Sequence, residues 1–465
     1  MVIRLYNTKH NRKEEFVPLQ PGKVGMYCCG PTTYNYIHLG NARPLVVFDA
    51  IRRYLIWRGY EVTYVQNFTD VDDKIIKRAA EEHSSAQEIA EKYIAAYFED
   101  TAALNTIPAD VHPRVTQHMD DIIQLIQQIL DNGHAYVAEG DVYFDVRSLP
   151  SYGELSGRDI DDMRAGARVM PGDIKRDPLD FALWKAAKPG EPYWDSPWGK
   201  GRPGWHIECS AMSCKYLGRD FDIHGGGADL IFPHHENEIA QSKAAGGNFA
   251  KYWLHNGFIT VNEEKMSKSL GNFFLLRDIL SKFPGDVIRY YLLATHYRSP
   301  IDFADDKLEA AAKSLERIRN SYFLLQDAAK RAVDGPCHIQ EQIDNARQAF
   351  IEAMDDDFNT ALAFSAVFNF CHELNAYLAQ NLATKEDVAQ AQKLFEDLDS
   401  VLAVIIEPAA ENAGLEDQLM DLILDIRQNA RSKKDWATAD AIRDGLKALG
   451  VVIEDTPQGA RWKKG

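Results

Sequence analysis

The stretch from Tyr27 to Asn41, Y-C-C-G-P-T-T-Y-N-Y-I-H-L-G-N, sets the interpretation of the rest of the chain. The residues from Val24 to Cys29 are partly apolar and end at Gly30-Pro31, which is typical of a strand that stops. Beyond the turn, apolar residues recur at helical spacing from Leu45 to Leu55, and Gly59 closes the segment. The sequence therefore predicts a strand, a turn and a helix that begins near Gly40.

This turn combines groups that bind phosphate with a group that binds metal. His38, Gly40 and Asn41 fall at the predicted helix start, where backbone N–H groups attract phosphate. Gly40 lets a ligand approach the backbone, His38 adds a donor, and Cys29 lies at the end of the strand beside the same turn. A buried cysteine and a surface histidine in an ordinary turn would give the same short pattern, so the turn alone leaves both interpretations open.

Composition narrows the class of protein. The 465 residues favour several domains, and a hydrophobic content of 45% is ample for a sizeable core. A formal charge of −17 argues against non-specific coating of nucleic acid, although a local basic patch could still hold RNA. The six cysteines are too few and too scattered for a disulfide framework. Because the chain shows neither a signal peptide nor a run of 18 apolar residues, we expect a cytoplasmic protein that does not span a membrane.

Strand and helix patterns alternate along the first part of the chain. Residues 61–68 alternate like a strand, at the spacing of a parallel βαβ unit. Thr69-Asp70 is interpreted as the N-cap of a helix over residues 73–82. One apolar face predicts a helix from Arg114 to Asn132. Residues 136–200 are rich in Gly, Pro, Asp and Tyr, so we interpret the region from about 114 to 200 as an insertion.

A second glycine-rich segment follows a predicted strand. Phe221–His224 is interpreted as the strand, and Gly225–Gly227 as a loop that lets a ligand approach the backbone. Asp229, just beyond the glycines, could accept hydrogen bonds from a ribose or an amine. A plain loop with a capping aspartate is the alternative.

A pair of possible metal ligands comes next. Pro233 suits the first position of a helix, which places His234 in its first turn and Glu238 on the same face. This spacing suits two metal ligands, although a solvated His–Glu pair has the same spacing.

The later part of the chain is a lysine loop followed by helices. The loop K-M-S-K-S-L-G-N at 265–272 suits a polyphosphate, and a solvated lysine loop is the alternative. Helical spacing over 306–407 predicts an antiparallel bundle, with a break near 355–357 and its last helix at 394–406. Residues 408–414 are interpreted as a linker, and 415–465 as a small unit with a helix near 435–449 and short strands near 451–453.

The tail reverses the charge of the chain. Residues 427–465 hold nine basic and five acidic residues, the pattern expected for binding a polyanion. Trp436 and Trp462 offer flat surfaces on which unstacked bases could lie, and Asp440 and Asp455 could accept hydrogen bonds from base edges. A solvated helix with a basic end is the alternative.

Taken in order, these motifs resemble a known family. H-L-G-N at 38–41, K-M-S-K-S at 265–269, the bundle and the small tail unit are together similar to class I aminoacyl-tRNA synthetases. The resemblance is narrowed to cysteinyl-tRNA synthetases, over nearly the whole chain, by Y-C-C-G-P-T (27–32), G-W-H-I-E-C-S-A-M (204–212), H-G-G-G-A-D-L (224–230) and F-P-H-H-E-N-E (232–238). It implies an α/β fold with a Rossmann-type parallel-sheet catalytic domain (1–305, insertion about 114–200), an α-helical bundle (306–407) and an α+β anticodon-binding unit (415–465).

The resemblance also implies a zinc site. Its ligands carry over onto Cys29, Cys209, His234 and Glu238. Strand alternation agrees that Cys28 and Cys29 point to opposite faces, so only one of them is expected to be a ligand. Because a thiol binds Zn²⁺ as thiolate far better than an alcohol does, the metal would distinguish cysteine from serine without an editing domain.

The implied reaction joins L-cysteine to ATP, with Mg²⁺, to give cysteinyl-adenylate and pyrophosphate, and then transfers the cysteinyl group to the 3′ end of the cysteine tRNA. The resemblance assigns catalytic roles to His38, Lys265 and Lys268. It assigns substrate and nucleotide binding to Gly30, Thr32, His38, Gly40, Asn41, Thr69, Trp205, Gly227, Asp229 and Lys268. Asn41 replaces the family's second histidine, so it keeps a hydrogen-bond donor but carries no charge. We expect a monomer.

Three other functions are alternatives to a cysteinyl-tRNA synthetase. A zinc hydrolase would use His234, Glu238 and a metal-bound water, but gives no reason for the lysine loop or the tail. An RNA-binding protein without activity would not need the ATP-type motifs. A cysteine ligase that acts on an amino sugar would lack the tail unit, which this chain keeps.

Overall fold

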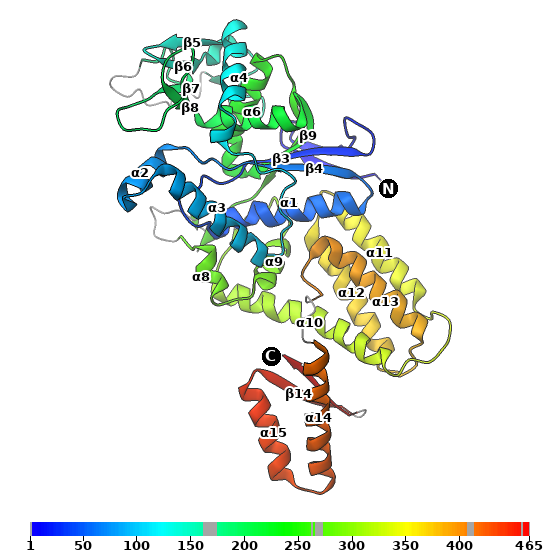
Figure 1. Ribbon diagram of the computed structural model, residues 1–465. Coiled ribbons are helices and arrows are strands. Elements are labelled where there is room, and N and C mark those ends of the chain that lie inside the picture. Colours follow the sequence, from blue (N-terminus) through cyan, green and yellow to red (C-terminus); the bar gives the residue numbers. More distant parts are fainter. Residues whose placement is uncertain are drawn as a thin grey trace. The chain divides into compact units, whose positions relative to one another are not determined.

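The computed structural model describes residues 2–160, 174–261, 264–265, 273–406, 413–456 and 459–464. The chain forms two compact units, residues 1–406 and 407–465 (Figure 1). Among the helices described, none is both long and apolar enough to cross a membrane.

The first unit is built on a four-stranded parallel sheet in the order β10–β9–β3–β4. Its strands are β3 (Lys23–Cys28), β4 (Glu61–Gln66), β9 (Asp220–Gly227) and β10 (Phe249–Asn256). The register pairs Cys28 with both Gln66 and Gly225, so the carboxyl ends of three neighbouring strands meet at one edge. Helix α1 (Leu39–Trp57) forms the crossover from β3 to β4. The predicted parallel α/β fold is confirmed.

The glycines after His224 belong to the strand, so the predicted loop is wrong. Gly225, Gly226 and Gly227 continue β9 and pair with residues 254–256 of β10. A Cβ atom at Gly225 would lie 2.3 Å from the ring of Phe48, which is buried in α1. Glycine is therefore needed here to let α1 pack directly on the sheet.

Two helix starts also differ from the prediction. Asp72, and not Thr69-Asp70, caps helix α2 (Asp73–Glu82), because its side chain accepts from the N–H of Lys74 at 2.8 Å. Asp70 instead accepts hydrogen bonds from the N–H and the hydroxyl of Thr116. The chain there forms a single turn over Val115–Gln117, and α4 begins only at Met119 and ends at Asp131.

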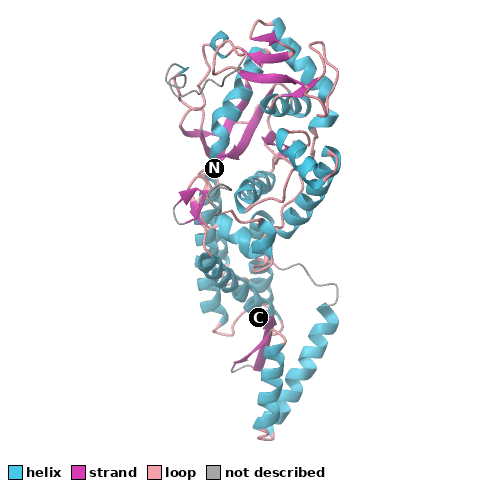
Figure 2. Cartoon of the chain, turned by 90° about the vertical axis from the view of Figure 1, so that its left-hand side faces the viewer, coloured by secondary structure: helices cyan, strands magenta, loops and turns pink. Residues whose placement is uncertain are grey.

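The insertion forms a second, antiparallel sheet. Its strands β5 (Ala135–Ala138), β6 (Asp141–Phe144), β7 (Phe181–Ala186) and β8 (Gly201–Pro203) pair in sequence order. Helix α6 (Trp205–Leu217) returns the chain to β9. Figure 2 shows the strands of both four-stranded sheets gathered at one end of the first unit. The remaining elements of this half are β1 (Arg4–Asn7), β2 (Arg12–Glu15), α3 (Ala86–Ala103) and α7 (Glu236–Ala244).

Helices dominate the rest of the first unit. Three short strands, β11 (Ile259–Val261), β12 (Glu264–Lys265) and β13 (Ile301–Asp302), form a small sheet of their own. The expected helical break is confirmed, since α11 ends at Asp355 and α12 begins at Thr360. The last bundle helix starts nine residues before the prediction because Thr384 and Asp387 form a capping box. The helices are α8 (Leu276–Leu280), α9 (Gly285–Leu293), α10 (Asp305–Ala329), α11 (Gln340–Asp355), α12 (Thr360–Leu378) and α13 (Lys385–Leu402).

The second unit contains two helices and a hairpin. Helix α15 (Trp436–Ala448) and strands β14 (Val451–Thr456) and β15 (Gly459–Lys464) match the prediction. Helix α14 (Ala413–Ser432) was not predicted, and its first residues fall in the stretch interpreted as a linker. Arg427 of α14 makes a two-point ion pair with Asp455 of β14, which ties the long helix to the hairpin.

A buried arginine links the sheet domain to the bundle, and removing it should destabilise the first unit. Arg289 of α9 is fully buried, pairs with Asp49 of α1 at 2.6 Å and donates to the carbonyl of Leu402 at 2.7 Å. Arg289→Met should lower the free energy of unfolding by about 3 kcal/mol, because it leaves a buried carboxylate partly uncompensated. Urea titration followed by tryptophan fluorescence measures the effect.

The matched control is Arg53→Met, because Arg53 pairs with the same Asp49 from a more exposed position. Its cost should be about 1 kcal/mol or less. Equal losses for the two variants would contradict the assignment of Arg289 as the buried link.

Candidate active site

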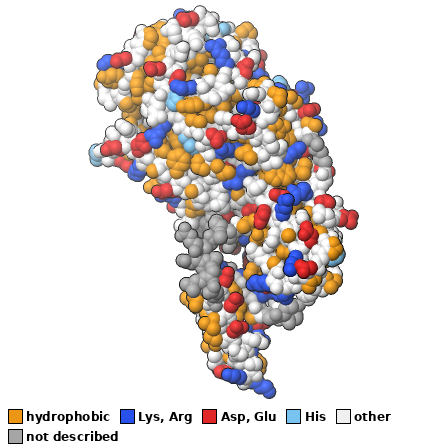
Figure 3. All heavy atoms as spheres, turned by 45° about the vertical axis from the view of Figure 1, so that its right-hand side comes forward, with side chains coloured by type: hydrophobic (Ala, Val, Ile, Leu, Met, Phe, Trp, Pro, Cys, Tyr) orange, Lys and Arg blue, Asp and Glu red, His pale blue; other side chains and the backbone are white. Residues whose placement is uncertain are grey.

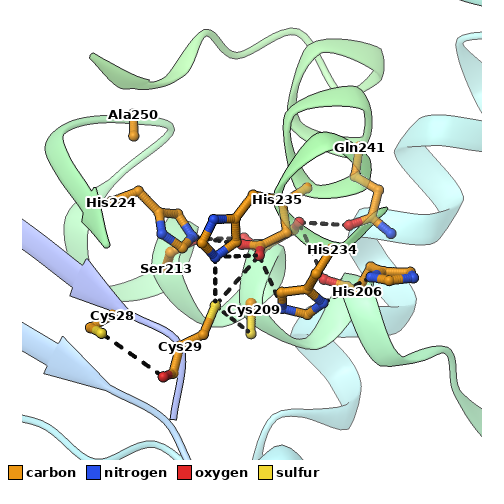
Figure 4. A network of polar contacts seen from close by, with 12 residues as sticks. Cys28, Cys29, His206, Cys209, Ser213, His224, His234, His235, Gln241 and Ala250 are labelled. Carbon is orange, nitrogen blue, oxygen red and sulfur yellow. Dashed lines mark hydrogen bonds and ion pairs between the residues drawn. The ribbon is translucent and has the colours of Figure 1, made fainter. Parts of the chain in front are cut away.

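Four of the predicted residues meet at the carboxyl edge of the parallel sheet. Cys29 directly follows β3, Cys209 lies on α6, and His234 precedes α7, which carries Glu238 (Figure 4). The ligand atoms of these four side chains all lie within 4.8 Å of one another, and three of the residues are buried. The structure therefore brings together the whole set that the sequence resemblance implied.

Pro233 stands at the start of a helical segment, as predicted, because Phe232 before it has non-helical backbone angles. The segment runs from the short turn over Ile231–His235 into α7, which begins at Glu236. His234 lies beside Glu238, with 3.1 Å between Nε2 and Oε1.

The distances suit a tetrahedral metal ion. Two sulfurs that share a tetrahedral zinc at usual bond lengths lie about 3.8 Å apart, and a sulfur and an oxygen about 3.6 Å apart. The Sγ atoms of Cys29 and Cys209 are 3.7 Å apart. The Sγ atom of Cys29 lies 3.5 Å from Oε1 of Glu238. Two thiols, one imidazole and one carboxyl are also the donors that zinc prefers, so the residues fit this metal.

A second combination of ligands, Cys29 and Glu238 with His224 and His235, is also compact. It fits less well, because His224 Nε2 is 2.8 Å from Oε2 of Glu238, a hydrogen bond and not the spacing of two ligands of one ion. His235 Nε2 lies 4.0 Å from Oε1 of Glu238, against about 3.3 Å expected for a shared tetrahedral ion. We therefore assign His224 and His235 to the surroundings of the site.

These surroundings are rich in histidine. His234 contacts His206 through their Nδ1 atoms at 2.8 Å, and His235 Nδ1 lies 2.7 Å from His255 Nε2. Burial lowers the pKa of His206 and of His255 to about 3 and the pKa of His234 well below its usual range. The rings are therefore neutral, which is the form that binds metal and that orients metal ligands through hydrogen bonds.

Without a cation, the surroundings of the two thiols favour their protonated form. Burial, together with Cys209 and Glu238, raises the pKa of Cys29 well above its usual range. Hydrogen bonding with Cys29 lowers the pKa of Cys209, but burial and Glu238 outweigh it and the pKa is raised. Burial raises the pKa of Cys28 to about 12, and that side chain lies in the core on the other face of the sheet. The predicted opposite orientation of the two cysteines is confirmed by their different clusters.

The predicted phosphate seat is the capped start of α1. His38 is the N-cap residue, and its Nδ1 accepts from the N–H of Asn41 at 3.2 Å. Asn41 Oδ1 accepts the N–H of His38 in return at 3.3 Å. The Asn41 side chain thus completes a capping box, a role that the sequence did not suggest, and Gly40 lies in the first turn.

The turn after β3 makes close contacts with the chain at the end of β4. Gly30 donates its N–H to Oδ1 of Asn67 at 2.9 Å, and a Cβ atom on Gly30 would lie 1.6 Å from the carbonyl oxygen of Asn67. Thr32 and Thr69 form a backbone bridge beside them. The hydroxyl of Thr69 donates to the buried carboxyl of Glu208 at 3.0 Å, so Thr69 reaches the same helix as Cys209.

Of the remaining predicted residues, Trp205 contacts a metal candidate. Trp205 is 42% exposed, and its ring centroid lies 4.3 Å from that of His234. Gly227 ends β9, and Asp229 follows in a single turn over Ala228–Leu230. The backbone of Lys265 belongs to β12, which pairs with β11, and Lys268 lies outside the described residues.

Sequence reasoning missed several residues of the site. His206, Glu208, His224, His235, His255 and Asn67 all contact ligand candidates or their neighbours. The quoted motifs contain most of them, but a histidine next to a ligand in sequence has no spacing that reveals whether it binds metal. His255 is the penultimate residue of β10, and only the register of the sheet places it here.

In the second unit, the predicted base-reading carboxylates are already paired. Asp455 binds Arg427 and Arg431, and Asp440 lies 3.0 Å from Arg443, so the suggestion that they accept from bases is not supported. Trp436 is 58% exposed at the start of α15. Lys433 and Lys434 are exposed in the turn before it, the end of this unit at which Figure 3 shows basic side chains.

Comparison with known proteins defines the class. Residues 15–313 match the family model of the tRNA synthetases class I (C) catalytic domain, 349–407 a DALR domain, and 417–462 the cysteinyl-tRNA ligase anticodon binding domain. The fold is similar to methionyl-tRNA synthetase of Mycobacterium tuberculosis in complex with methionyl-adenylate, with a TM-score of 0.64 and 15% identity over 86% of this chain and 94% of that one. The chain is therefore a class I aminoacyl-tRNA synthetase.

The sequence relatives identify the branch of that class. The chain is 59% identical to the cysteine–tRNA ligase of Desulforamulus reducens, over 99% of this chain and all of that one. It is 60% identical to the cysteine–tRNA ligase of Heliobacterium modesticaldum, over 100% of both chains. The chain belongs to the cysteine–tRNA ligase family.

The close approach at Gly30 gives a sharp test of the site geometry. Gly30→Ala should displace the end of β4 or the turn that carries Cys29, because a methyl group cannot overlap the Asn67 carbonyl. We expect the variant to lose several kcal/mol of stability, on the order of the cost of overpacking a core, and to bind metal poorly. Thermal unfolding and metal content measure both effects.

Gly445→Ala is the matched control, since nothing lies within 4 Å of a Cβ built at this position of α15. It should be neutral or stabilising by about 0.5–1 kcal/mol. A Gly30→Ala protein that unfolds like the wild type and keeps its metal would show that the strand ends can separate freely.

Proposed function

We propose that this cysteine–tRNA ligase selects L-cysteine through a zinc ion held by Cys29, Cys209, His234 and Glu238. The observation that carries the proposal is the spacing of these four side chains, which matches a tetrahedral ion at the carboxyl edge of the sheet. Residues 30–38 connect Cys29 to the capped start of α1, and we assign the amino acid to the metal and the phosphates to this helix start.

Zinc supplies the discrimination that packing alone cannot. Serine and cysteine differ by one atom, and a pocket that relies on shape separates such analogues only weakly. A metal–thiolate bond is available to cysteine and not to serine, which makes rejection by factors of about 10⁴ to 10⁵ reachable. The neutral histidines, with His206 against His234 and His224 against Glu238, would hold the ligands in position for this task.

The nucleotide is assigned to the turn between β3 and α1. Backbone N–H groups near Gly40 and the ring of His38 would bind phosphate, with Thr32, Thr69, Trp205, Gly227 and Asp229 around the aminoacyl-adenylate. Lys265 and Lys268 would stabilise the leaving pyrophosphate together with Mg²⁺, and the cysteine carboxylate would attack the α-phosphate. The chain supplies positioning and charge, and no protein nucleophile is required.

We assign catalysis to residues 1–305, with the insertion at about 114–200, the bundle to 306–407, and anticodon binding to 415–465. The matched family models at 15–313, 349–407 and 417–462 support this division. We also propose that the protein acts as a monomer in a reducing cytoplasm, which agrees with its six free cysteines. A ligase acting on an amino sugar is disfavoured, because it would not need the anticodon model at 417–462.

The zinc proposal predicts one ion per chain and a strong preference for cysteine. Elemental analysis should find one zinc, and ATP–pyrophosphate exchange should proceed with cysteine and fall to background with serine. Cys209→Ser combined with His234→Ala should lose the ion, since only two of the four ligands remain.

Cys214→Ser, on the same helix α6 but outside the ligand set, is the control and should keep both metal and exchange. Full zinc retention in the double variant, or comparable exchange with serine, would refute the assignment.

The proposed role of the tail predicts that a change there weakens tRNA binding and leaves the activation of cysteine by ATP unchanged. Trp436→Ala should raise the Michaelis constant for tRNA about tenfold, because stacking of one unpaired base contributes about 1–3 kcal/mol. ATP–pyrophosphate exchange should stay unchanged. Leu449→Ala removes a still more exposed apolar side chain, 80% against 58%, just beyond the other end of α15, and should leave charging normal. Normal charging by Trp436→Ala would exclude this residue as a contact.

A further inference from the structure

Two polar side chains beside the metal candidates are buried without a partner. The hydroxyl of Tyr27 and the Nδ2 amide group of Asn67 are solvent-inaccessible, and neither makes a hydrogen bond within the described part of the chain. Both residues are fully buried. Since a buried unsatisfied donor costs about 1–3 kcal/mol, two of them next to one site call for an explanation.

Tyr27 faces the same side of the sheet as the metal candidates. It precedes Cys29 by two residues along β3, and alternate residues of a strand share a face. Tyr27, Cys29 and Cys209 accordingly belong to one packed cluster. The phenol hydroxyl of Tyr27 is a hydrogen-bond donor, and it is inaccessible to solvent within this cluster.

Asn67 directly follows the neighbouring strand β4 and lies beside the sulfur of Cys209. Its Oδ1 accepts the N–H of Gly30 at 2.9 Å and lies 3.8 Å from Sγ of Cys209. Because the Gly30 contact requires an oxygen, the amide orientation is fixed and Nδ2 is left as the unused group. When Cys209 is a thiol it can donate to Oδ1, but a metal-bound thiolate has no proton to donate and needs donors instead.

The charge of the proposed site explains the need for such donors. Two thiolates and a carboxylate around a divalent ion carry a net charge of −1, and the thiolate of a bound cysteine makes it −2. A buried site of this charge is costly unless hydrogen bonds disperse it. The histidines contact His234 and Glu238, whereas Tyr27, packed in one cluster with Cys209, has an unused donor.

We infer that Tyr27 is a positioning residue that donates a hydrogen bond to the sulfur of Cys209 when it holds the metal. The inference rests on the proposed function, because it assumes that Cys209 is a ligand. This bond withdraws negative charge from the sulfur, so the metal keeps enough affinity for a further thiolate, that of the substrate. Selectivity for cysteine then depends on a residue outside the set of metal ligands.

The test uses the full-length protein with Co²⁺ in place of zinc, since cobalt reports on its sulfur ligands by charge-transfer absorption. Tyr27→Phe removes one donor and keeps the ring, so the sulfur-to-cobalt band should move to longer wavelength before any substrate is added. The zinc form of the variant should show a Michaelis constant for cysteine raised about tenfold, with that for ATP unchanged. Tyr252→Phe is the control and should leave the band in place. Tyr252 is a buried residue of β10, and its hydroxyl donates to the backbone carbonyl of Glu15.

A second substitution guards against a merely structural effect. Site-specific 3-fluorotyrosine at position 27 is a stronger donor of nearly the same shape, so it should move the band to shorter wavelength. Opposite shifts for the two variants cannot arise from altered packing.

The outcomes separate this inference from the zinc proposal. If the wild-type protein binds neither zinc nor cobalt, the proposed metal site itself fails. If it binds one ion per chain with sulfur-to-cobalt absorption, but Tyr27→Phe and 3-fluorotyrosine leave the band unmoved, the donor does not act on the sulfur and only the present inference is overturned.

Discussion

The parallel register of β3 with β9 and β4 is the constraint on which the site depends. It brings the end of β3, where Cys29 lies, between the glycines of β9 and the end of β4. At Gly30 the carbonyl of Asn67, and at Gly225 the ring of Phe48, lie closer than any side chain would allow. The contact between the ends of β3 and β4 and the packing of α1 on the sheet therefore require glycine. A ligand set drawn from residues 29, 209, 234 and 238 is possible only because this edge holds β3, α6 and α7 together.

The electrostatics of the site follow from its burial. Removing two thiols and a carboxyl from water disfavours their charged forms, which is why the pKa values of Cys29 and Cys209 are raised. A divalent cation reverses this balance, because it favours the deprotonated thiols and is attracted to the carboxylate. The same burial keeps the surrounding histidines neutral, so they can orient ligands without adding positive charge that would compete with the metal.

Much of this arrangement could be predicted from the sequence, and the failures have physical causes. The ordered motifs indicated the class of fold, the four side chains that meet at the sheet edge and the start of α1 near Gly40. The role of Gly225–Gly227 was misjudged because a run of glycines resembles a loop, whereas only the tertiary contact with Phe48 shows why a strand needs it. His255 could not be found, since its place beside His235 depends on pairing between β9 and β10. The capping role of Asn41 was not evident because its motif suggests a donor for phosphate, and Asp70, expected to cap α2, accepts hydrogen bonds from Thr116 while Asp72 forms the cap.

The charge of residues 427–465 differs in sign from that of the chain as a whole. The chain as a whole is acidic, with a formal charge of −17, which suits repulsion of non-specific nucleic acid. Within residues 427–465 the balance is reversed, and yet Arg427, Arg431 and Arg443 are held by carboxylates of the same unit. The basic side chains outside these pairs, such as Lys433 and Lys434 beside Trp436, are exposed near an aromatic surface. An acidic chain disfavours RNA in general, whereas an exposed aromatic side chain beside exposed lysines suits an RNA that offers unstacked bases.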